Sequence, residues 1–407
     1  MKVLFSPIGH QDLKSDLRGS LGQIVQKYRP EKIILYFSAE LVKYTNDVMQ
    51  MIVLLKEEHN YSPEVDIVPD ENMINPNSYQ TIFPKFREHI RKLLIDLDGQ
   101  DDEYQLILNA ASGTPAMKSA LIFISTLSNK NVIATQVDDP KYNKNEDRTY
   151  EVQTKYLVDE IQIQNIKTLV QKYDYYGAYE IVEGYSNKAG LDNVAVKYIR
   201  GAKFRSILDN QKGKDCFGGT DFKYDPQKGE GELSEYLNIL QLKIKRSEFA
   251  DFTRAISPAL RETLYYLIDK LGVNRNEFSK LEPNKNTSKK SRILDVEKVK
   301  NNPRLRNIFR DVLEKPNKPY YYNAHLLNLL DEQDVDDRYY NKIKVVVNFE
   351  SGVRNLAAHE IIKIDENRII RDCGKSPQEI LNIMAKLTNS ELNLYDNINQ
   401  EIIRLLG

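Results

Sequence analysis

The 407-residue sequence predicts an α/β domain with a Rossmann-like, mostly parallel sheet, followed by a helical linker and an all-helical C-terminal domain. Three observations support this. A chain of this length exceeds what one hydrophobic core usually serves. Over roughly the first 155 residues, short β-rich runs alternate with longer amphipathic stretches, which is typical of strand–helix–strand units. Beyond that point apolar residues recur at helical spacing.

The predicted sheet has five strands with helices between them. Two of the connecting stretches, residues 39–58 and 80–97, have the amphipathic pattern of helices. In such a doubly wound domain, ligands bind in the loops at the carboxyl ends of the strands. The strands are expected at residues 3–5, 32–37, 65–68, 104–108 and 131–135.

The rest of the chain is predicted to be helical. Apolar residues at helical spacing occur over residues 163–173 and 233–244, and a longer helix is expected at 249–271. The stretch 209–231 is rich in Gly, Lys and Asp and predicts a long loop. We expect domains at 1–155 and 246–407, joined by a helical region at 156–245.

Composition restricts the function. The chain has 58 Lys+Arg and 59 Asp+Glu, so a nucleic-acid site must be local rather than a broad basic surface. The only cysteines, Cys216 and Cys373, cannot form a disulfide framework or a cysteine metal site. The N-terminal apolar run is too short for a signal peptide, and no run approaches the roughly 20 apolar residues that span a bilayer. We expect a cytoplasmic protein without a membrane segment.

The loop after the fourth predicted strand has the chemistry of an anion site. Thr114 suits a helix N-cap and Pro115 the first helical position, while Gly113 allows close backbone approach. The N–H groups at the start of the next helix would favour a phosphate. The spacing matches neither a Walker A loop nor the Gly-x-Gly-x-x-Gly fingerprint.

Polar loops also follow the first two strands, as Ser6-Pro7-Ile8-Gly9-His10 and Ser38-Ala39-Glu40. Each alone is an ordinary capped turn, but three at one sheet edge favour a ligand site. The pairing of the first loop with Ser112-Gly113-Thr114-Pro115 resembles CARF domains, the CRISPR-associated Rossmann-like sensors. The resemblance implies a domain that binds cyclic oligoadenylate across a two-fold dimer axis, through Gly9, His10, Ser112, Gly113 and Thr114.

A second motif lies near the C-terminus. RNA can be cut without a metal if side chains transfer the 2′-hydroxyl and 5′-oxygen protons and a cation stabilises the phosphorane. Histidine suits the proton transfers and arginine the phosphate. His359 is the only one of the five histidines with an arginine, Arg354, five positions before it. No second metal ligand stands at suitable spacing near His359, so no metal site is expected.

The geometry of this pair leaves two alternatives. Five α-helical residues turn by about 500°, so Arg354 and His359 would lie roughly 140° apart. Either a helix begins within the motif, with Ser351 as N-cap, or two subunits assemble the site. Asn355 is four residues before His359 and shares its face. An isolated Arg-x4-His is more often a surface arginine and a core histidine, but the apolar runs 345–349 and 361–362 favour a functional site.

The segment Arg354-Asn355-Leu356-Ala357-Ala358-His359 resembles the Arg-Asn-x3-His motif of HEPN ribonucleases. That family dimerises to form a composite cleft, which the resemblance extends to this chain. It implies proton transfer by His359, phosphorane stabilisation by Arg354 and positioning by Asn355. Basic residues over 280–310 and the tyrosines at 320–322 and 339–340 offer weak support for an RNA path.

Over its full length the sequence resembles the accessory CARF–HEPN endoribonucleases of type III-A (Csm) CRISPR systems. The resemblance implies a homodimer that needs no cofactor and is activated by a cyclic oligoadenylate, with the hexa-adenylate favoured. It further implies cleavage of single-stranded RNA to 2′,3′-cyclic phosphate and 5′-hydroxyl ends, and a functional link to the CRISPR effector complex. Slow cleavage of the activator by the CARF domain stays open.

The rival interpretation is a ligand-sensing regulator without nuclease activity, in which residues 289–310 hold a DNA-recognition helix. About 160 residues follow the linker, which is too many for a lone winged helix. A regulator also has no need of Arg354 and His359.

Overall fold

The computed structural model describes residues 1–13, 19–99, 103–128, 131–184, 192–220, 231–283, 290–315, 319–332, 337–354 and 362–407. These residues form two compact units, Met1–Ile161 and Gln162–Gly407. Each unit is described by itself.

The N-terminal unit is built on a six-stranded sheet with the order β3-β2-β1-β4-β5-β6. The first five strands pair in parallel and confirm the predicted ones, whereas the three-residue β6 was not predicted and pairs antiparallel to β5. A three-residue edge strand is too short to leave a periodic pattern. The strands are β1 (Lys2–Pro7), β2 (Lys32–Ser38), β3 (Glu64–Asp70), β4 (Gln105–Asn109), β5 (Val132–Val137) and β6 (Thr149–Glu151).

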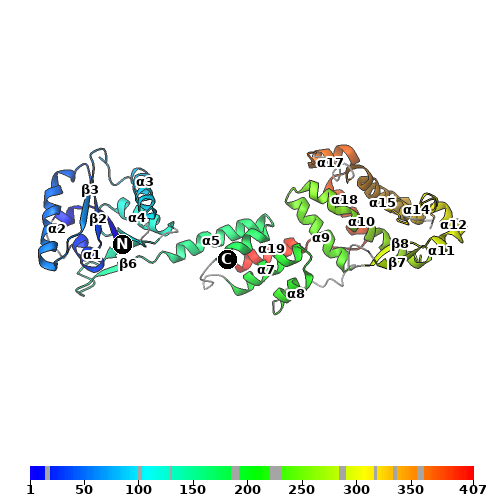
Figure 1. Cartoon of the computed structure of the whole chain (residues 1–407), viewed down its shortest axis with the longest axis horizontal. Coiled ribbons are helices and arrows are strands. Elements are labelled where there is room, and N and C mark those ends of the chain that lie inside the picture. Colours follow the sequence, from blue (N-terminus) through cyan, green and yellow to red (C-terminus); the bar gives the residue numbers. More distant parts are fainter. Residues whose placement is uncertain are drawn as a thin grey trace. The chain divides into compact units, whose positions relative to one another are not determined.

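Helices cover both faces of this sheet (Figure 1). Helices α1 (Ser20–Tyr28) and α2 (Thr45–His59) pack on one face, and α3 (Tyr79–Asp98) and α4 (Pro115–Thr126) pack on the other. Alternate strand residues enter the two cores, which explains why the central strands are apolar almost throughout. The helix predicted from residue 39 begins at Thr45, after the 3₁₀ turn η2 (Val42–Tyr44).

The second unit is mostly helical. The expected helices over 163–173, 233–244 and 249–271 are present as α5, α9 and α10. The predicted loop over 209–231 is wrong in its first part, where α8 forms. Asp209 caps this helix by accepting from the N–H of Lys212, and the helix packs on α7, where the ring of Phe217 meets that of Tyr198. The helices between residues 155 and 270 are α5 (Lys155–Gln171), α6 (Tyr175–Gly184), α7 (Asn193–Ser206), α8 (Asn210–Phe217), α9 (Glu232–Lys245) and α10 (Phe249–Lys270).

The remaining part of the second unit contains shorter helices and one β-hairpin. The hairpin pairs β7 (Ser279–Pro283) with β8 (Lys290–Leu294) and follows the 3₁₀ turn η4 (Arg275–Glu277). It adds strands to a domain that was expected to be all-helical. The other elements are α11 (Val296–Lys300), α12 (Pro303–Ile308), α13 (Arg310–Leu313), α14 (Asn323–Asp331), α15 (Asp337–Phe349), η5 (Glu350–Arg354), α17 (Glu366–Cys373), α18 (Pro377–Leu387) and α19 (Leu394–Leu405).

Two hydrophobic cores organise these helices. Helices α9, α10, α14, α15 and α18 share the larger core. Helices α5, α6 and α7 form the smaller core together with the C-terminal helix α19, which returns to lie beside α7 (Figure 1). Helix α19 therefore packs mainly with α5, α6 and α7 rather than with α17 and α18, which come directly before it in the chain.

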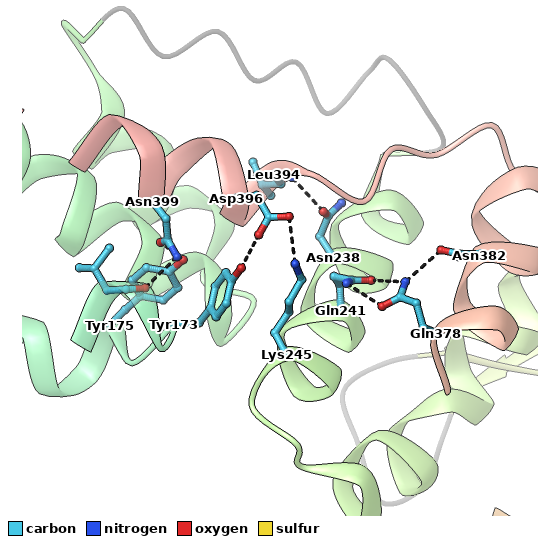
Figure 2. A network of polar contacts seen from close by, with 11 residues as sticks. Tyr173, Tyr175, Asn238, Gln241, Lys245, Gln378, Asn382, Leu394, Asp396 and Asn399 are labelled. Carbon is cyan, nitrogen blue, oxygen red and sulfur yellow. Dashed lines mark hydrogen bonds and ion pairs between the residues drawn. The ribbon is translucent and has the colours of Figure 1, made fainter. Parts of the chain in front are cut away.

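A polar junction connects the two cores where α19 begins (Figure 2). Asp396 accepts from the hydroxyl of Tyr173 at 2.5 Å and from Nζ of Lys245 at 3.3 Å. Two further hydrogen bonds belong to this junction. Asn238 accepts from the N–H of Leu394 at 3.2 Å, and the hydroxyl of Tyr175 donates to Asn399 at 2.6 Å. The junction thus joins the end of α9, the turn after α5 and the start of α19.

The predicted fold class is confirmed: a Rossmann-like unit precedes a helical region and a largely helical C-terminal part. Among the helices whose residues the structure describes, none combines the length and apolar character needed to cross a membrane.

Candidate functional site

A cavity of about 340 Å³ opens at the carboxyl ends of β1, β2 and β4. The first turn of α4 and the segment before α3 complete its lining through Thr114, Met117, Lys118, Pro76 and Asn77. All five residues predicted to bind a ligand line this one cavity. They are Gly9, His10, Ser112, Gly113 and Thr114.

Buried hydrogen bonds connect the loops that line the cavity. The side chain of Asn109, at the end of β4, is fully buried and its amide nitrogen donates to the hydroxyls of Ser6 (2.9 Å) and Ser112 (3.0 Å). Its amide oxygen accepts from the N–H groups of Ala111 and Ser112. Asn109 therefore connects the ends of two neighbouring strands and shapes the loop that the sequence indicated.

Asp12 extends this network to the first loop. Its carboxylate is 4% exposed, accepts from the hydroxyl of Ser112 at 3.0 Å and accepts from the N–H of Gly9 at 2.9 Å. Burial raises the pKa of Asp12, although these hydrogen bonds and the positive charge of Lys118 oppose the shift. A buried acidic side chain thus holds together the two loops that were predicted to bind a ligand.

The two glycines of the site approach each other closely. A Cβ at Gly9 would lie 2.9 Å from the backbone nitrogen of Gly113, so no larger residue fits without movement. Gly113 has φ +83°, a conformation that side chains disfavour, and a Cβ there would lie 2.8 Å from Sδ of Met117. The close contact of the β1 and β4 loops depends on both glycines.

Thr114 begins α4 as predicted. Its hydroxyl accepts from the N–H of Met117 at 3.3 Å, and Pro115 occupies the first helical position. The same hydroxyl donates to the carbonyl of Pro76 at 2.5 Å, which brings the segment before α3 to the cavity. At the opposite rim, the exposed side chains of His10 and Glu40 lie 3.5 Å apart.

Several cavity residues were not singled out from the sequence. Asp12 and Lys118 line the cavity and Asn109 supports the loop beside it, and all three stand in the two segments that drew attention. The available signal was the polar Asn109 directly after an apolar strand. Pro76 and Asn77 gave no such signal, because they follow the third strand at a distance and reach the cavity only through the tertiary fold.

The C-terminal motif is only partly covered by the structure. Asn355 and His359 lie outside the described residues, and Arg354 is the last residue of η5. No helix begins at Ser351, because α15 continues directly into the π-helical turn η5 and Ser351 lies inside that turn, where its hydroxyl donates to the carbonyl of Asn348 at 3.1 Å. Whether a helix begins later in the motif is a question that falls on residues outside the described ranges.

The segment leading to Arg354 is anchored in the larger core. Phe349 is fully buried, with its ring 6.1 Å from that of Phe252 in α10. Glu350 accepts from the side-chain amide of Asn323 at 2.8 Å. Asn323 in turn accepts from Nε of Arg261 at 3.3 Å. The start of η5 is therefore held by an apolar contact at Phe349 and by a hydrogen bond at Glu350.

His325, the other histidine of this part of the chain, has a structural role. Its Nδ1 accepts from the N–H of Tyr322 at 2.9 Å, so the proton sits on Nε2, which contacts Asp311 at 2.9 Å. The ring stacks on Phe309. Both nitrogens are thus used in capping α14 and joining it to α13.

The basic stretch over 280–310 is largely engaged within the chain. Lys280 pairs with Glu282, Lys298 with Asp295, and Arg304 with Glu332. Its helices α11 and α12 have five and six residues, which is too short for a DNA-recognition helix. Tyr320, Tyr322 and Tyr339 are exposed, whereas Tyr321 is buried. Within the ranges that the structure describes, no three His, Cys, Asp or Glu side chains are grouped to hold a metal ion.

A Rossmann-like unit with a polar cavity at its strand ends is typical of ligand-binding α/β proteins, and in this chain a helical unit follows it. The chain matches the models of the Cas_Csm6 CARF domain over residues 64–168, the CRISPR-associated protein Csm6 6H domain over 152–206 and the Cas_Csm6 HEPN domain over 222–403.

Curated relatives cover the whole chain. The CRISPR system endoribonuclease Csm6 of Mycobacterium tuberculosis is 31% identical, over 99% of this chain and 98% of the relative. The Csm6 endoribonuclease of Streptococcus thermophilus is 26% identical over 100% of both chains. The chain therefore belongs to the Csm6 family of CRISPR system endoribonucleases. Enterococcus italicus Csm6 bound to cyclic hexa-2′-fluoro-hexa-dAMP shares the fold, with a TM-score of 0.72, 16% identity and 100% coverage of both chains.

Proposed function

We propose that the protein is an RNA endoribonuclease that a cyclic oligoadenylate activates, acting in type III CRISPR antiviral defence. The observation that carries the proposal is the full-length similarity to the Csm6 endoribonuclease of Mycobacterium tuberculosis. The protein would sense its activator through residues 1–155, bridge through 156–245 and cut RNA through 246–407. We further propose that it acts in the cytoplasm, linked functionally to the type III-A effector complex.

The activator would bind at the cavity lined by Gly9, His10, Ser112, Gly113 and Thr114. The first turn of α4 and Lys118 offer positive potential to phosphodiester groups. The structural neighbour bound to a cyclic hexanucleotide supports a ring of six. A volume of about 340 Å³ suits a drug-sized ligand and not a whole hexa-adenylate. This size supports a homodimer whose two cavities share one ring.

RNA cleavage would use Arg354, Asn355 and His359. A base takes the proton of the ribose 2′-hydroxyl, the 2′-oxygen attacks the phosphorus, and the bond from phosphorus to the 5′-oxygen breaks as that oxygen is protonated. His359 would transfer protons, Arg354 would stabilise the charged phosphorane and Asn355 would position the phosphate. Each atom in this step is supplied by the RNA and side chains, so products carry 2′,3′-cyclic phosphate and 5′-hydroxyl ends.

Two copies of the motif would form one cleft. Arg354 ends a π-helical turn continuous with α15, so the alternative of a helix beginning at Ser351 no longer accounts for the separation of Arg354 and His359. Activation requires that the ring bind the cleavage-competent dimer better than the resting one. The bound ring would thereby favour the competent arrangement of the two motifs.

The test is cleavage of a labelled single-stranded RNA by the full chain with cyclic tetra-adenylate, cyclic hexa-adenylate or no ring, each with and without a chelator. We expect the hexa-adenylate to stimulate cleavage most, the chelator to have no effect, and the products to carry the stated ends. Absence of RNA cleavage with either ring, together with tight binding of duplex DNA, would instead indicate a regulator.

A further inference from the structure

The chain reaches Arg354 through an unusual turn. The π-helical η5 (Glu350–Arg354) follows α15 without a break. Single π-helical turns are rare and occur frequently at functional sites. Such a turn contains one more residue than an α-helical turn, and each helical residue advances the chain by about 100°. The path of the backbone into Arg354 therefore depends on η5 keeping its π conformation.

Two polar side chains from two other helices secure Glu350, the first residue of this turn. Asn323, the first residue of α14, is 4% exposed and donates from Nδ2 to Oε2 of Glu350 at 2.8 Å. Its Oδ1 accepts from Nε of Arg261 in α10 at 3.3 Å. Nη2 of the same guanidinium donates to the carbonyl of Tyr321 at 3.2 Å. Because the amide has a donor on one side and an acceptor on the other, its partners define its orientation.

An apolar contact secures the preceding residue. Phe349 is fully buried and its ring lies 6.1 Å from that of Phe252, which like Arg261 belongs to α10. Two successive residues, Phe349 and Glu350, are thus tied to the same helix, one directly and the other through Asn323. Contacts on two sides of the chain oppose rotation of the turn about its axis.

We infer that Arg261, Asn323 and Glu350 are positioning residues for ribonuclease chemistry, acting through η5 to orient Arg354. The inference rests on the proposed function. None of the three needs to touch RNA for this role. Loss of the hydrogen bonds that join these three residues is therefore expected to lower kcat, because Arg354 is then misplaced. The KM for RNA and the affinity for the activator should stay nearly unchanged.

The test exchanges the partners of one hydrogen bond in the full chain, saturated with cyclic hexa-adenylate. Asn323→Asp places two carboxylates opposite each other, and we expect kcat to fall about 10- to 100-fold. Adding Glu350→Gln restores a donor opposite an acceptor, while Arg261 still donates to position 323. The double variant is expected to recover to within about threefold of the parent, and Glu350→Gln alone to stay as active as the parent.

Two further variants keep the result interpretable. Glu350→Ala removes only a half-buried carboxylate and is expected to lower kcat as Asn323→Asp does. Glu332→Ala, at the opposite end of α14, removes the partner of Arg304 (2.5 Å) and is expected to leave kcat unchanged.

Three results would overturn the inference: full activity of Asn323→Asp, no recovery in the double variant, or a loss of kcat that follows the melting temperature across all variants, Glu332→Ala included. A parent chain that does not cleave RNA with the ring would overturn the proposed function, and this inference with it.

Discussion

The cavity at the sheet edge and the segment that ends at Arg354 are supported in different ways. Under the cavity, Ser6, Asp12, Asn109 and Ser112 form buried hydrogen bonds within one sheet and its loops. The segment is held by contacts from distant helices, among them the ring of Phe252 and the hydrogen bonds made by Asn323. The difference teaches that the cavity is preorganised by local contacts, whereas the segment before Arg354 is held by contacts with residues far away in the chain.

The largest effect is expected from a change in the C-terminal motif, which should nearly abolish RNA cleavage but leave activator binding intact. His359→Ala removes the proposed proton-transfer group, and we expect kcat for RNA cleavage to fall by roughly 1000-fold. Because the cavity is built from other residues, affinity for cyclic hexa-adenylate measured by calorimetry should stay unchanged. Lys363→Ala, four residues later with a side chain 86% exposed, is the control and should cleave as the parent does. Equal cleavage by His359→Ala and parent would remove His359 from the mechanism.

The reciprocal change is at the cavity. Gly113→Val adds a branched side chain at φ +83°, and its Cβ would lie 2.8 Å from Sδ of Met117 and 3.2 Å from Cβ of Pro7. The β1 and β4 loops must then separate, and we expect the activator concentration for half-maximal cleavage to rise about 100-fold. Cleavage without activator should not change.

A matched glycine tests whether space or backbone strain causes this effect. Gly272 also has a positive φ of +76°, but a Cβ there would meet nothing within 4 Å. Gly272→Val should therefore leave the dose-response curve as in the parent. A similar shift in both variants would mean that general destabilisation, and not the cavity, explains the result for Gly113.

A moderate effect is expected at the junction of Figure 2. Asp396→Asn keeps an acceptor for the Tyr173 hydroxyl but removes the charge that Lys245 contacts. We expect α19 to lose about 1 kcal/mol of protection in amide hydrogen exchange. Glu401→Gln breaks the exposed pair with Arg404 on the same helix and should change protection by less than about 0.5 kcal/mol. Equal protection in Asp396→Asn and the parent would show that the junction does not secure α19.

The smallest effect concerns His89 in the sheet unit. Burial lowers the pKa of His89 below its ordinary 6.5, against the charge of Asp70 and together with that of Lys85. The folded state thus prefers neutral His89, so this contribution to stability is complete above pH 6.5 and is lost as pH falls through the lowered pKa. His89→Gln should reduce the decrease in melting temperature between pH 7.5 and 5 by roughly 2 °C. An identical pH dependence in variant and parent would contradict the shift.

The sequence alone determined most of the sheet unit. Apolar runs bounded by polar loops predicted its five parallel strands, because strands buried on both faces leave a continuous local signal. Thr114 followed by Pro115 predicted the start of α4, since helix capping depends on neighbouring residues only. Gly9, His10, Ser112, Gly113 and Thr114 line one cavity because strand ends of a parallel sheet meet at one edge.

Only the tertiary structure decided the features that depend on residues far apart in the chain. Helix α8 forms in a stretch whose composition predicted a loop, and α19 returns to the core of α5 to α7. The π-helical turn before Arg354 showed that no helix begins at Ser351. Asn323 and Glu350 are joined across 27 residues. Local periodicity carries no information on such contacts, because they form only when separate helices pack together.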